Sequence, residues 1–314
     1  MSQVLVTRRM PAAPVARLAL EHDVDLHSGS QPLPVEDLHE RLEGKSGVVV
    51  LLPDRMDRAA IDAAGPSLKI IANVAVGHDN LDVAYARSRG IVCTNTPDVL
   101  TDATADLTWA LILGITRRLG EGERLIRAGQ WKGWSFDFML GSGLQGKVLG
   151  IVGGGRIGRA VAARAAAFGM KVAVSSRSDP GWPGAEFMTL DRLIPGADVL
   201  SLHVPMTPET RHLIDKTAIT RMKRSAYLIN TTRGAVVDEA GLAWALKEHL
   251  IAGAALDVFE REPEVHPDLL GLDNVMLVPH LGSATRETRI AMADLAVDNV
   301  LAVLGGGPAL TPIG

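Results

Sequence analysis

One segment, Lys147–Arg159, constrains the fold of this chain more than any other. It opens with an apolar run, Val148–Val152, that is typical of a buried strand, and an alanine-rich helical pattern from Val161 to Phe168 follows. Between them lies a G-x-G-x-x-G motif that begins at Gly153. Its glycines permit a tight turn, close approach of the backbone to a pyrophosphate, and close packing of the helix on the strand. Because free N–H groups at a helix amino terminus also attract anions, we predict a dinucleotide-binding turn here.

The end of the next predicted strand, Met170–Ser175, indicates which dinucleotide binds. At this point, roughly twenty residues after the glycines, sites for cofactors without a 2′-phosphate use Asp or Glu to bind the ribose hydroxyls. The chain instead has Ser176 and Arg177, and no carboxylate occurs before Asp179. Hydroxyls and a guanidinium hold a phosphate dianion that an acid would repel. The sequence therefore predicts NADP as the cofactor, with NADPH preferred over NADH.

The composition narrows the class of protein. The 314 residues suffice for one or two domains, and 47% hydrophobic with 22% charged residues is ordinary for a globular protein. A net charge of -4 offers no basis for nucleic-acid binding. The single cysteine, Cys93, excludes an intrachain disulfide and fits a reducing cytosol, so we expect a cytoplasmic protein. No segment has the length and apolarity to cross a membrane, and no spacing of His, Cys or acidic residues predicts a metal site.

Short apolar runs alternate with helical patterns along the chain, as in βαβ units with parallel sheets. The predicted strands of the first part are Val4–Thr7, Val24–His27, Val48–Leu52, Leu68–Val74 and Ile91–Cys93. Those of the second part are Val148–Val152, Met170–Ser175, Val199–His203, Tyr227–Asn230, Ala254–Val258 and Val275–Leu277. The fold class is thus α/β, with two Rossmann-like or flavodoxin-like parallel-sheet domains.

Two long helical patterns suggest how these domains are connected. Thr101–Leu119 lies between the two sets of strands, and Ser283–Leu304 follows the last strand and could return to the first domain. We expect residues 1–100 plus 284–314 to form a substrate-binding domain and residues 101–283 to form a dinucleotide-binding Rossmann domain. Because clefts between α/β domains are preferred ligand sites, we expect the active site in the cleft between them.

Three ionisable residues follow successive predicted strands of the second part: Arg233, Glu262 and His280. Ligands gather beyond the carboxyl ends of parallel strands, so these groups could converge beside a nicotinamide. A carbonyl that accepts a hydride needs a proton, which His280 can donate near neutral pH. A carboxylate bonded to the imidazole, for which we select Glu262, favours its protonated form. Arg233 can hold a substrate carboxylate and polarise the carbonyl. Taken singly, each residue could instead be structural or solvated.

The chain resembles the D-isomer-specific 2-hydroxyacid dehydrogenase family from end to end. The segments that carry the resemblance are Gly77–Asp82, Val92–Pro97, Ala103–Leu107, Gly150–Gly158, Leu202–Thr210, Asn230–Gly234, Leu256–Pro263 and Pro279–His280. The resemblance implies that Arg233, Glu262 and His280 are catalytic, that backbone at Val76-Gly77 binds the substrate carboxylate, and that Asp257 contacts the cofactor carboxamide. Gln130–Trp134 resembles the glyoxylate and hydroxypyruvate reductase branch. Two departures are Gly154, where many members carry a larger residue, and Thr232, at a common Ala position.

The complete set of predicted contacts follows from these motifs and the resemblance. The predicted cofactor contacts are Thr104, Gly153, Gly155, Arg156, Ile157, Gly158, Ser176, Arg177, His203, Val204, Pro205, Thr231 and Asp257. The predicted substrate contacts are Leu52, Val76, Gly77, Arg233 and His280. The histidines expected at the surface are His22, His27, His39, His212, His249 and His266.

The sequence favours an NADPH-preferring reductase of small 2-keto acids, glyoxylate or hydroxypyruvate, that yields the 2-hydroxy acid with His280 as general acid. Two alternatives stay open: a dinucleotide-sensing corepressor or scaffold on the same fold, as in C-terminal binding proteins, and a relative of phosphoglycerate dehydrogenase. We also predict a homodimer packed through Thr101–Leu119, which is apolar nearly all round, and the aromatic stretch Trp131–Phe138.

Overall fold

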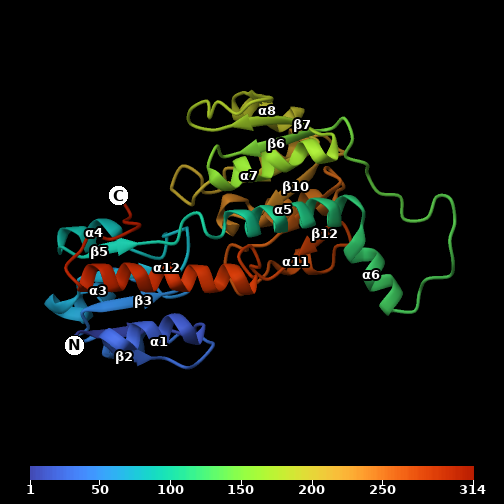
Figure 1. Cartoon of the computed structure of the whole chain (residues 1–314). Coiled ribbons are helices and arrows are strands. Elements are labelled where there is room, and N and C mark those ends of the chain that lie inside the picture. The colour runs from blue at the N-terminus through green and yellow to red at the C-terminus, as the bar shows by residue number, and fades with distance from the viewer. The chain divides into compact units, whose positions relative to one another are not determined.

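Strands and helices alternate along the computed structural model of the chain, which describes all 314 residues (Figure 1). The chain divides into two domains: a first domain of Met1–Leu100 with Ser283–Gly314, and a second domain of Thr101–Gly282. Every strand pair in both sheets is parallel. The predicted α/β class with two parallel-sheet domains is therefore confirmed.

The first domain is built on a five-stranded sheet in the order β2-β1-β3-β4-β5. Its strands are β1 (Gln3–Val6), β2 (Asp23–Leu26), β3 (Gly47–Val50), β4 (Ile70–Asn73) and β5 (Val92–Thr94). The central strands β3 and β4 are buried along their whole length, as their continuous apolar runs predict. The order reverses between β1 and β3, which creates a switch point at the carboxyl edge of this sheet.

Helices cover both faces of the first sheet. The helices are α1 (Ala12–Glu21), α2 (Val35–Leu42), α3 (Arg58–Ala64), α4 (Val83–Ser88), the short 3-10 helix Gly65–Ser67 and the C-terminal α12 (Arg286–Leu304). One apolar cluster joins α2, α3 and α4 to the sheet, whereas α12 packs on α1, β3 and β4. The lone Cys93 is buried in the first cluster, and this burial raises the pKa of its thiol to about 11. It therefore behaves as a small apolar residue.

The second domain contains a seven-stranded sheet in the order β12-β11-β10-β9-β6-β7-β8. Its strands are β6 (Val148–Val152), β7 (Lys171–Ser175), β8 (Ala185–Phe187), β9 (Val199–Leu202), β10 (Tyr227–Asn230), β11 (Gly253–Leu256) and β12 (Val275–Leu277). Strand β8 was not predicted, because this short edge strand is largely exposed and carries no apolar run. The order reverses between β6 and β9, so the switch point of this sheet lies directly beyond the glycine turn.

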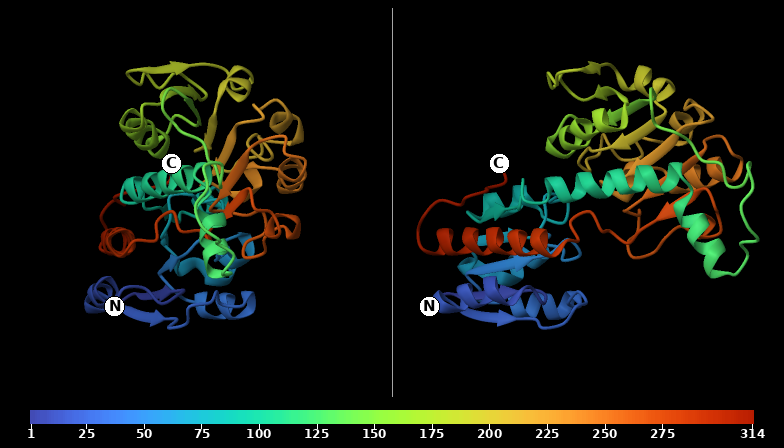
Figure 2. Two further views of the ribbon diagram at one scale, coloured as in Figure 1. Left: turned by 90° about the vertical axis from the view of Figure 1, so that its right-hand side faces the viewer. Right: turned by 45° about the vertical axis from the view of Figure 1, so that its right-hand side comes forward.

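The helices of the second domain form a layer on each face of its sheet (Figure 2). Helices α5 (Thr101–Thr116) and α7 (Arg156–Ala165), with the 3-10 helix Ala166–Phe168, share one apolar cluster with the sheet. The opposite cluster contains α8 (Leu190–Gly196), α9 (Lys216–Thr220), α10 (Glu239–Lys247), α11 (Pro267–Leu270) and the 3-10 helix Gly234–Val236. Helix α7 thus begins at Arg156, directly after the glycine turn.

Helix α5 ends before the predicted boundary at Leu119. It stops at Thr116, Arg118 adopts a left-handed backbone with φ of 54°, and α6 (Leu119–Arg127) starts in a new direction. Most apolar residues of α5 are buried within its own domain; Trp109, for example, stacks on Phe168 with ring centroids 4.3 Å apart. The apolar character of α5 is therefore explained by the domain core and does not require a partner chain.

Two other observations complete the fold. The expectation that His22 lies at the surface was wrong, because the residue is buried where the chain turns from α1 into β2. Its backbone N–H donates the last hydrogen bond of α1 to the carbonyl of Leu18 at 3.0 Å. No helix is both long and apolar enough to span a bilayer.

Candidate active site

The three predicted catalytic residues follow three neighbouring strands of the second domain. Arg233 comes after β10, Glu262 after β11 and His280 after β12, and these strands are adjacent in the sheet. Parallel strands end at the same edge, so the sheet itself brings these segments together. The sequence pattern that predicted this site is local: an ionisable residue follows each of three buried strands. The three residues could therefore be predicted without the structure.

Glu262 and His280 form a hydrogen-bonded pair. His280 Nδ1 lies 2.8 Å from Glu262 Oε2, while Glu262 Oε1 accepts a bond of 3.1 Å from the N–H of Phe259. Burial alone would raise the pKa of Glu262, but the bond and charge of His280, the Phe259 N–H and the charge of Arg233 together lower it. Because an ionised carboxylate only accepts, Nδ1 carries the proton of this bond, and Nε2 is left to exchange a proton with a ligand.

Asp257 anchors the segment that carries His280. His280 has a left-handed backbone with φ of 54°, and its N–H bonds to the carbonyl of Asp257 at 2.8 Å. The Asp257 carboxylate accepts the next two backbone N–H groups, those of Leu281 and Gly282. Burial raises the pKa of Asp257 despite these bonds. Asp257 thus supports the unusual backbone at His280, in addition to its predicted contact with a cofactor.

Asn230, the last residue of β10, organises the turn that carries Arg233. The buried Asn230 amide donates to the carbonyl of Arg233 at 2.9 Å, and its carbonyl oxygen accepts from the N–H and the hydroxyl of Thr232. The Arg233 guanidinium bonds to the carbonyl of Thr232 at 2.9 Å. The Thr found at a common Ala position of the family therefore adds a hydroxyl bond to this turn and removes none.

A second network, which the sequence did not predict, connects the loops that carry Arg233 and Glu262. A Glu239 side-chain oxygen accepts from the N–H of Glu260, and a Glu260 oxygen accepts in return from the N–H of Glu239 at 3.2 Å. His212 Nε2 lies 2.9 Å from the same Glu260 oxygen. A methyl group on Gly234 would lie 1.8 Å from the carbonyl carbon of Phe259, so the two loops are in direct contact. No short motif signals a network assembled from three distant segments.

The glycine turn after β6 has the shape that a dinucleotide requires. Gly153 has a φ of 113°, and a methyl group there would lie 2.3 Å from the carbonyl oxygen of His203. A methyl group on Gly158 would lie 2.3 Å from the carbonyl oxygen of Gly153. In contrast, a methyl group added to Gly155, the residue that precedes α7, would have no atom within 4 Å. Gly153 and Gly158 are thus packed tightly against other parts of the protein, whereas Gly155 leaves space for a ligand. Arg156 and Ile157, the first residues of α7, lie next to this space.

The other predicted cofactor contacts lie in the second domain, most of them directly after its strands. Ser176 and Arg177 follow β7, and the last residue of that strand, Ser175, accepts a bond from the N–H of Gly153 at 2.8 Å. Three predicted contacts, His203, Val204 and Pro205, follow β9, and Thr231 follows β10. Thr104 of α5 donates to the carbonyl of Gly282 at 3.2 Å. The residues present therefore fit a dinucleotide at the carboxyl edge of this sheet.

The predicted substrate contacts of the first domain lie at the carboxyl edge of its own sheet. Leu52 follows β3, and Val76 and Gly77 follow β4. A buried network unites these loops: Asp54 accepts from the hydroxyl of Thr7, from Arg8 at 3.0 Å and from the N–H of Leu51 at 2.9 Å.

Asn80 extends this network. Its amide donates to the carbonyl of Asp54 at 3.0 Å, while Asn73 donates to the carbonyl of Gly77 at 2.9 Å. Neither Asp54 nor Asn80 was predicted as a site residue: Asp54 lies in no motif, and Asn80 lies in the family segment Gly77–Asp82 but was assigned no role there.

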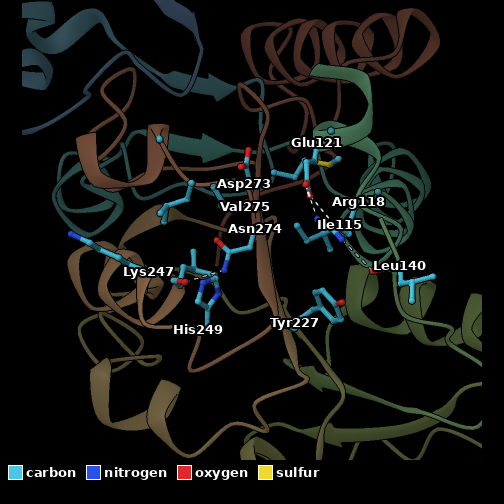
Figure 3. Close-up of a pocket in the computed structure, with 17 residues that line it drawn as sticks. Ile115, Arg118, Glu121, Leu140, Tyr227, Lys247, His249, Asp273, Asn274 and Val275 are labelled. Carbon is cyan, nitrogen blue, oxygen red and sulfur yellow. Dashed lines mark hydrogen bonds and ion pairs between the residues drawn. The ribbon is translucent and has the colours of Figure 1, made fainter. Parts of the chain in front are cut away.

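A separate cavity lies at the opposite edge of the second sheet. Its volume is about 490 Å³, and Tyr227 and Val275, which start β10 and β12, line it together with Arg118 and His249 (Figure 3). None of the predicted site residues lines this cavity. No group of three or more His, Cys, Asp or Glu side chains is arranged to hold a metal ion.

Known proteins resemble this chain in sequence over nearly its full length. A family model described as D-isomer specific 2-hydroxyacid dehydrogenase, NAD binding domain, matches residues 109–282. The glyoxylate reductase of Thermococcus litoralis is 46% identical and covers 97% of this chain and 94% of its own length. The glyoxylate reductase of Aeropyrum pernix is also 46% identical, over 97% of this chain and 93% of its own length.

Solved structures resemble the whole chain as well. A crystal structure of a protein from Thermus thermophilus has a TM-score of 0.95 and 46% identity, covering 99% of this chain and 100% of the other. The NADPH-dependent glyoxylate/hydroxypyruvate reductase of Sinorhizobium meliloti, solved with NADP and malonate, has a TM-score of 0.89 and 37% identity over 100% of this chain and 97% of the other.

Proposed function

The chain belongs to the D-isomer specific 2-hydroxyacid dehydrogenase family, and we propose that it reduces small 2-keto acids, glyoxylate or hydroxypyruvate, with a preference for NADPH. The observation that carries this proposal is the Glu262–His280 pair, with His280 Nδ1 and Glu262 Oε2 2.8 Å apart, on strands next to the one that precedes Arg233. The names of the relatives support the substrate class, since glyoxylate reductases share 46% identity with this chain.

The roles of the three catalytic residues follow from their chemistry. His280 donates a proton from Nε2 to the carbonyl oxygen of the keto acid as negative charge develops there. Glu262 holds the ring through Nδ1 and balances the positive charge of the protonated imidazole. Arg233 binds the substrate carboxylate and polarises the carbonyl. When bound, the reduced nicotinamide supplies the hydride.

Substrate binding also involves the first domain in this proposal. Backbone N–H groups at Val76 and Gly77 donate to the substrate carboxylate, and Leu52 contacts the small substituent of the keto acid. The bonds of Asp54 with Leu51 and of Asn73 with Gly77 hold these loops in place. Less conformational entropy is therefore lost when the substrate binds.

The cofactor preference is proposed on the loop after β7. Arg177 and Ser176 bind the 2′-phosphate of NADPH, and Asp179, the first acid of this loop, accepts the N–H of Gly181 at 2.9 Å within the loop itself. A charge-assisted bond of this type contributes about 1.5–3 kcal/mol, which corresponds to roughly a ten- to hundredfold effect on affinity.

Steady-state kinetics with glyoxylate and hydroxypyruvate test the proposal. We expect NADPH to exceed NADH in kcat/KM, and Arg177→Ala to raise KM for NADPH by about ten- to a hundredfold with a much smaller change for NADH. Equal use of the two cofactors by the unmodified enzyme would refute the preference. Failure to consume either cofactor with any small 2-keto acid would refute the reductase.

We further propose that the protein is a homodimer that associates through α6 and the segment after it. This segment protrudes from the body of the second domain (Figure 1) and exposes Trp131, Trp134, Phe136 and Phe138 at 55%, 81%, 86% and 40% of their surface. Exposed aromatic residues of this kind are enriched at protein–protein interfaces.

A further inference from the structure

The loop that carries Ser176 and Arg177 packs directly on the glycine turn. A methyl group on Gly154 would lie 2.9 Å from Ser176 Oγ, 3.1 Å from Ser176 Cβ and 3.2 Å from Pro180 Cβ. The Ser176 hydroxyl would have to move, and Ser176 Cβ and the Pro180 ring, which are not the ends of flexible side chains, would have to shift by a few tenths of an ångström. The absence of a side chain at Gly154 is thus what allows this loop to lie where it does.

Space, and not backbone conformation, explains why position 154 suits glycine. Gly153 has a φ of 113°, in the region that favours glycine, but Gly154 does not lie in the left-handed region. An L-residue could therefore adopt the backbone of Gly154. A side chain at position 154 would be unfavourable because of its contacts with Ser176 and Pro180. Substitution there should therefore shift the loop that contains these two residues and leave the backbone of the glycine turn unchanged.

The rest of the loop is ordered by its own contacts. Ser176 donates its hydroxyl to the carbonyl of Ser178, and Asp179 accepts the N–H of Gly181 at 2.9 Å. Trp182 packs with the apolar cluster beneath α7, with a ring atom 3.4 Å from where a methyl group on Gly158 would lie. The loop is therefore attached at two points, Pro180 on Gly154 and Trp182 on Gly158, and Arg177 lies just before the first.

We propose that Gly154 determines cofactor specificity: the missing side chain admits Ser176 and Pro180 onto the glycine turn and so positions Arg177 for the 2′-phosphate of NADPH. This inference rests on the proposed NADPH preference and adds a positioning residue to it. A larger residue at position 154 displaces Ser176 and Pro180 and carries Arg177 with them. NADH has no 2′-phosphate, so its use depends less on where that loop lies.

The test compares both cofactors in the holoenzyme for Gly154→Ala and Gly154→Leu. The NADPH-to-NADH ratio of kcat/KM should fall by about tenfold or more in Gly154→Leu, and less in Gly154→Ala, because part of a charge-assisted contact is lost. Activity with NADH reports that each variant is folded. Gly196→Ala in α8, an exposed glycine with nothing within 4 Å of the added methyl group, is the matched control and should leave the ratio unchanged.

A second comparison separates positioning from general damage. If Gly154 acts through Arg177, then Gly154→Leu should change the ratio little in an Arg177→Ala background, since both substitutions remove the same interaction. An unchanged ratio in Gly154→Leu, an equal fall for both cofactors, or full additivity with Arg177→Ala would overturn the inference while leaving the NADPH preference intact. A parent enzyme without that preference would instead refute the proposed function, and this inference with it.

Discussion

Two histidines show how environment assigns different roles to one residue type. His280 bonds to the carboxylate of Glu262, with its side chain 31% exposed, whereas the ring nitrogens of His203 have only Ser201 as a partner, at 2.9 Å, and Nδ1 is buried with none. Burial lowers the pKa of His203 to about 3. A ring with this pKa is neutral near pH 7, so His203 is poorly suited to donate a proton, although both residues follow strands of the same sheet.

The half-buried His203, whose Nδ1 is enclosed, should make the protein sensitive to acid. The unfolded chain binds a proton at this residue below about pH 6.5, while the folded chain does not do so until about pH 3, so stability falls as pH falls through this window. The expected loss approaches about 1.4 kcal/mol per pH unit, or about 2 kcal/mol between pH 6.5 and 5.

Urea unfolding at pH 7.5 and pH 5.0 measures this effect. His203→Gln should lose about 2 kcal/mol less than the parent over this interval, because its side chain does not titrate. His39→Gln, at a half-exposed position in α2, is the matched control and should behave like the parent. Parallel losses in parent and His203→Gln would show that the ring is not held neutral by burial.

At the scale of elements, the sequence predicted where apolar segments lie but not what covers them. The apolar faces of α5 were attributed to a partner chain, yet α7 and strands β10 and β11 cover them within the domain. The break at Arg118 was missed because the apolar pattern continues past it to Leu119, and only the left-handed backbone of Arg118 separates α5 from α6. The segment after α6 is left as the exposed apolar surface.

That segment predicts the behaviour of the protein in solution. Light scattering at micromolar concentration should give the mass of a dimer, and Trp134→Ser with Phe136→Ser should raise the dimer Kd by about tenfold or more, since buried aromatics dominate interface energies. Leu20→Ser in α1, 78% exposed and outside this segment, is the matched control and should leave the mass unchanged. A monomeric parent would exclude the homodimer.

For the molecule as a whole, local signals predicted more than distant contacts did. Short apolar runs, and an alternating pattern at β2, identified the strands of both sheets apart from β8, and the residues after them supplied Arg233, Glu262 and His280. The strand orders, with their switch points after β1 and β6, had to come from the structure, because no local pattern encodes which strands pair.

The supporting networks were also beyond the reach of the sequence. The Glu239–Glu260 bonds join segments 21 residues apart, and Thr7 bonds to Asp54 over 47 residues. Such contacts depend on the packed fold, whereas a charged residue after a strand is visible in the sequence alone. The catalytic candidates could thus be named from the sequence, while the groups that hold them in place could not.

The measurement that tests the central claim most directly is the turnover of His280→Asn with NADPH and glyoxylate, together with NADPH binding by fluorescence titration. If His280 Nε2 donates the proton while Glu262 holds Nδ1, kcat should fall by about 10²–10⁴-fold while the affinity for NADPH is retained, because the glycine turn and Arg177, which bind the phosphates in this account, follow strands β6 and β7 and not β12. Turnover in His280→Asn equal to that of the parent would contradict the account.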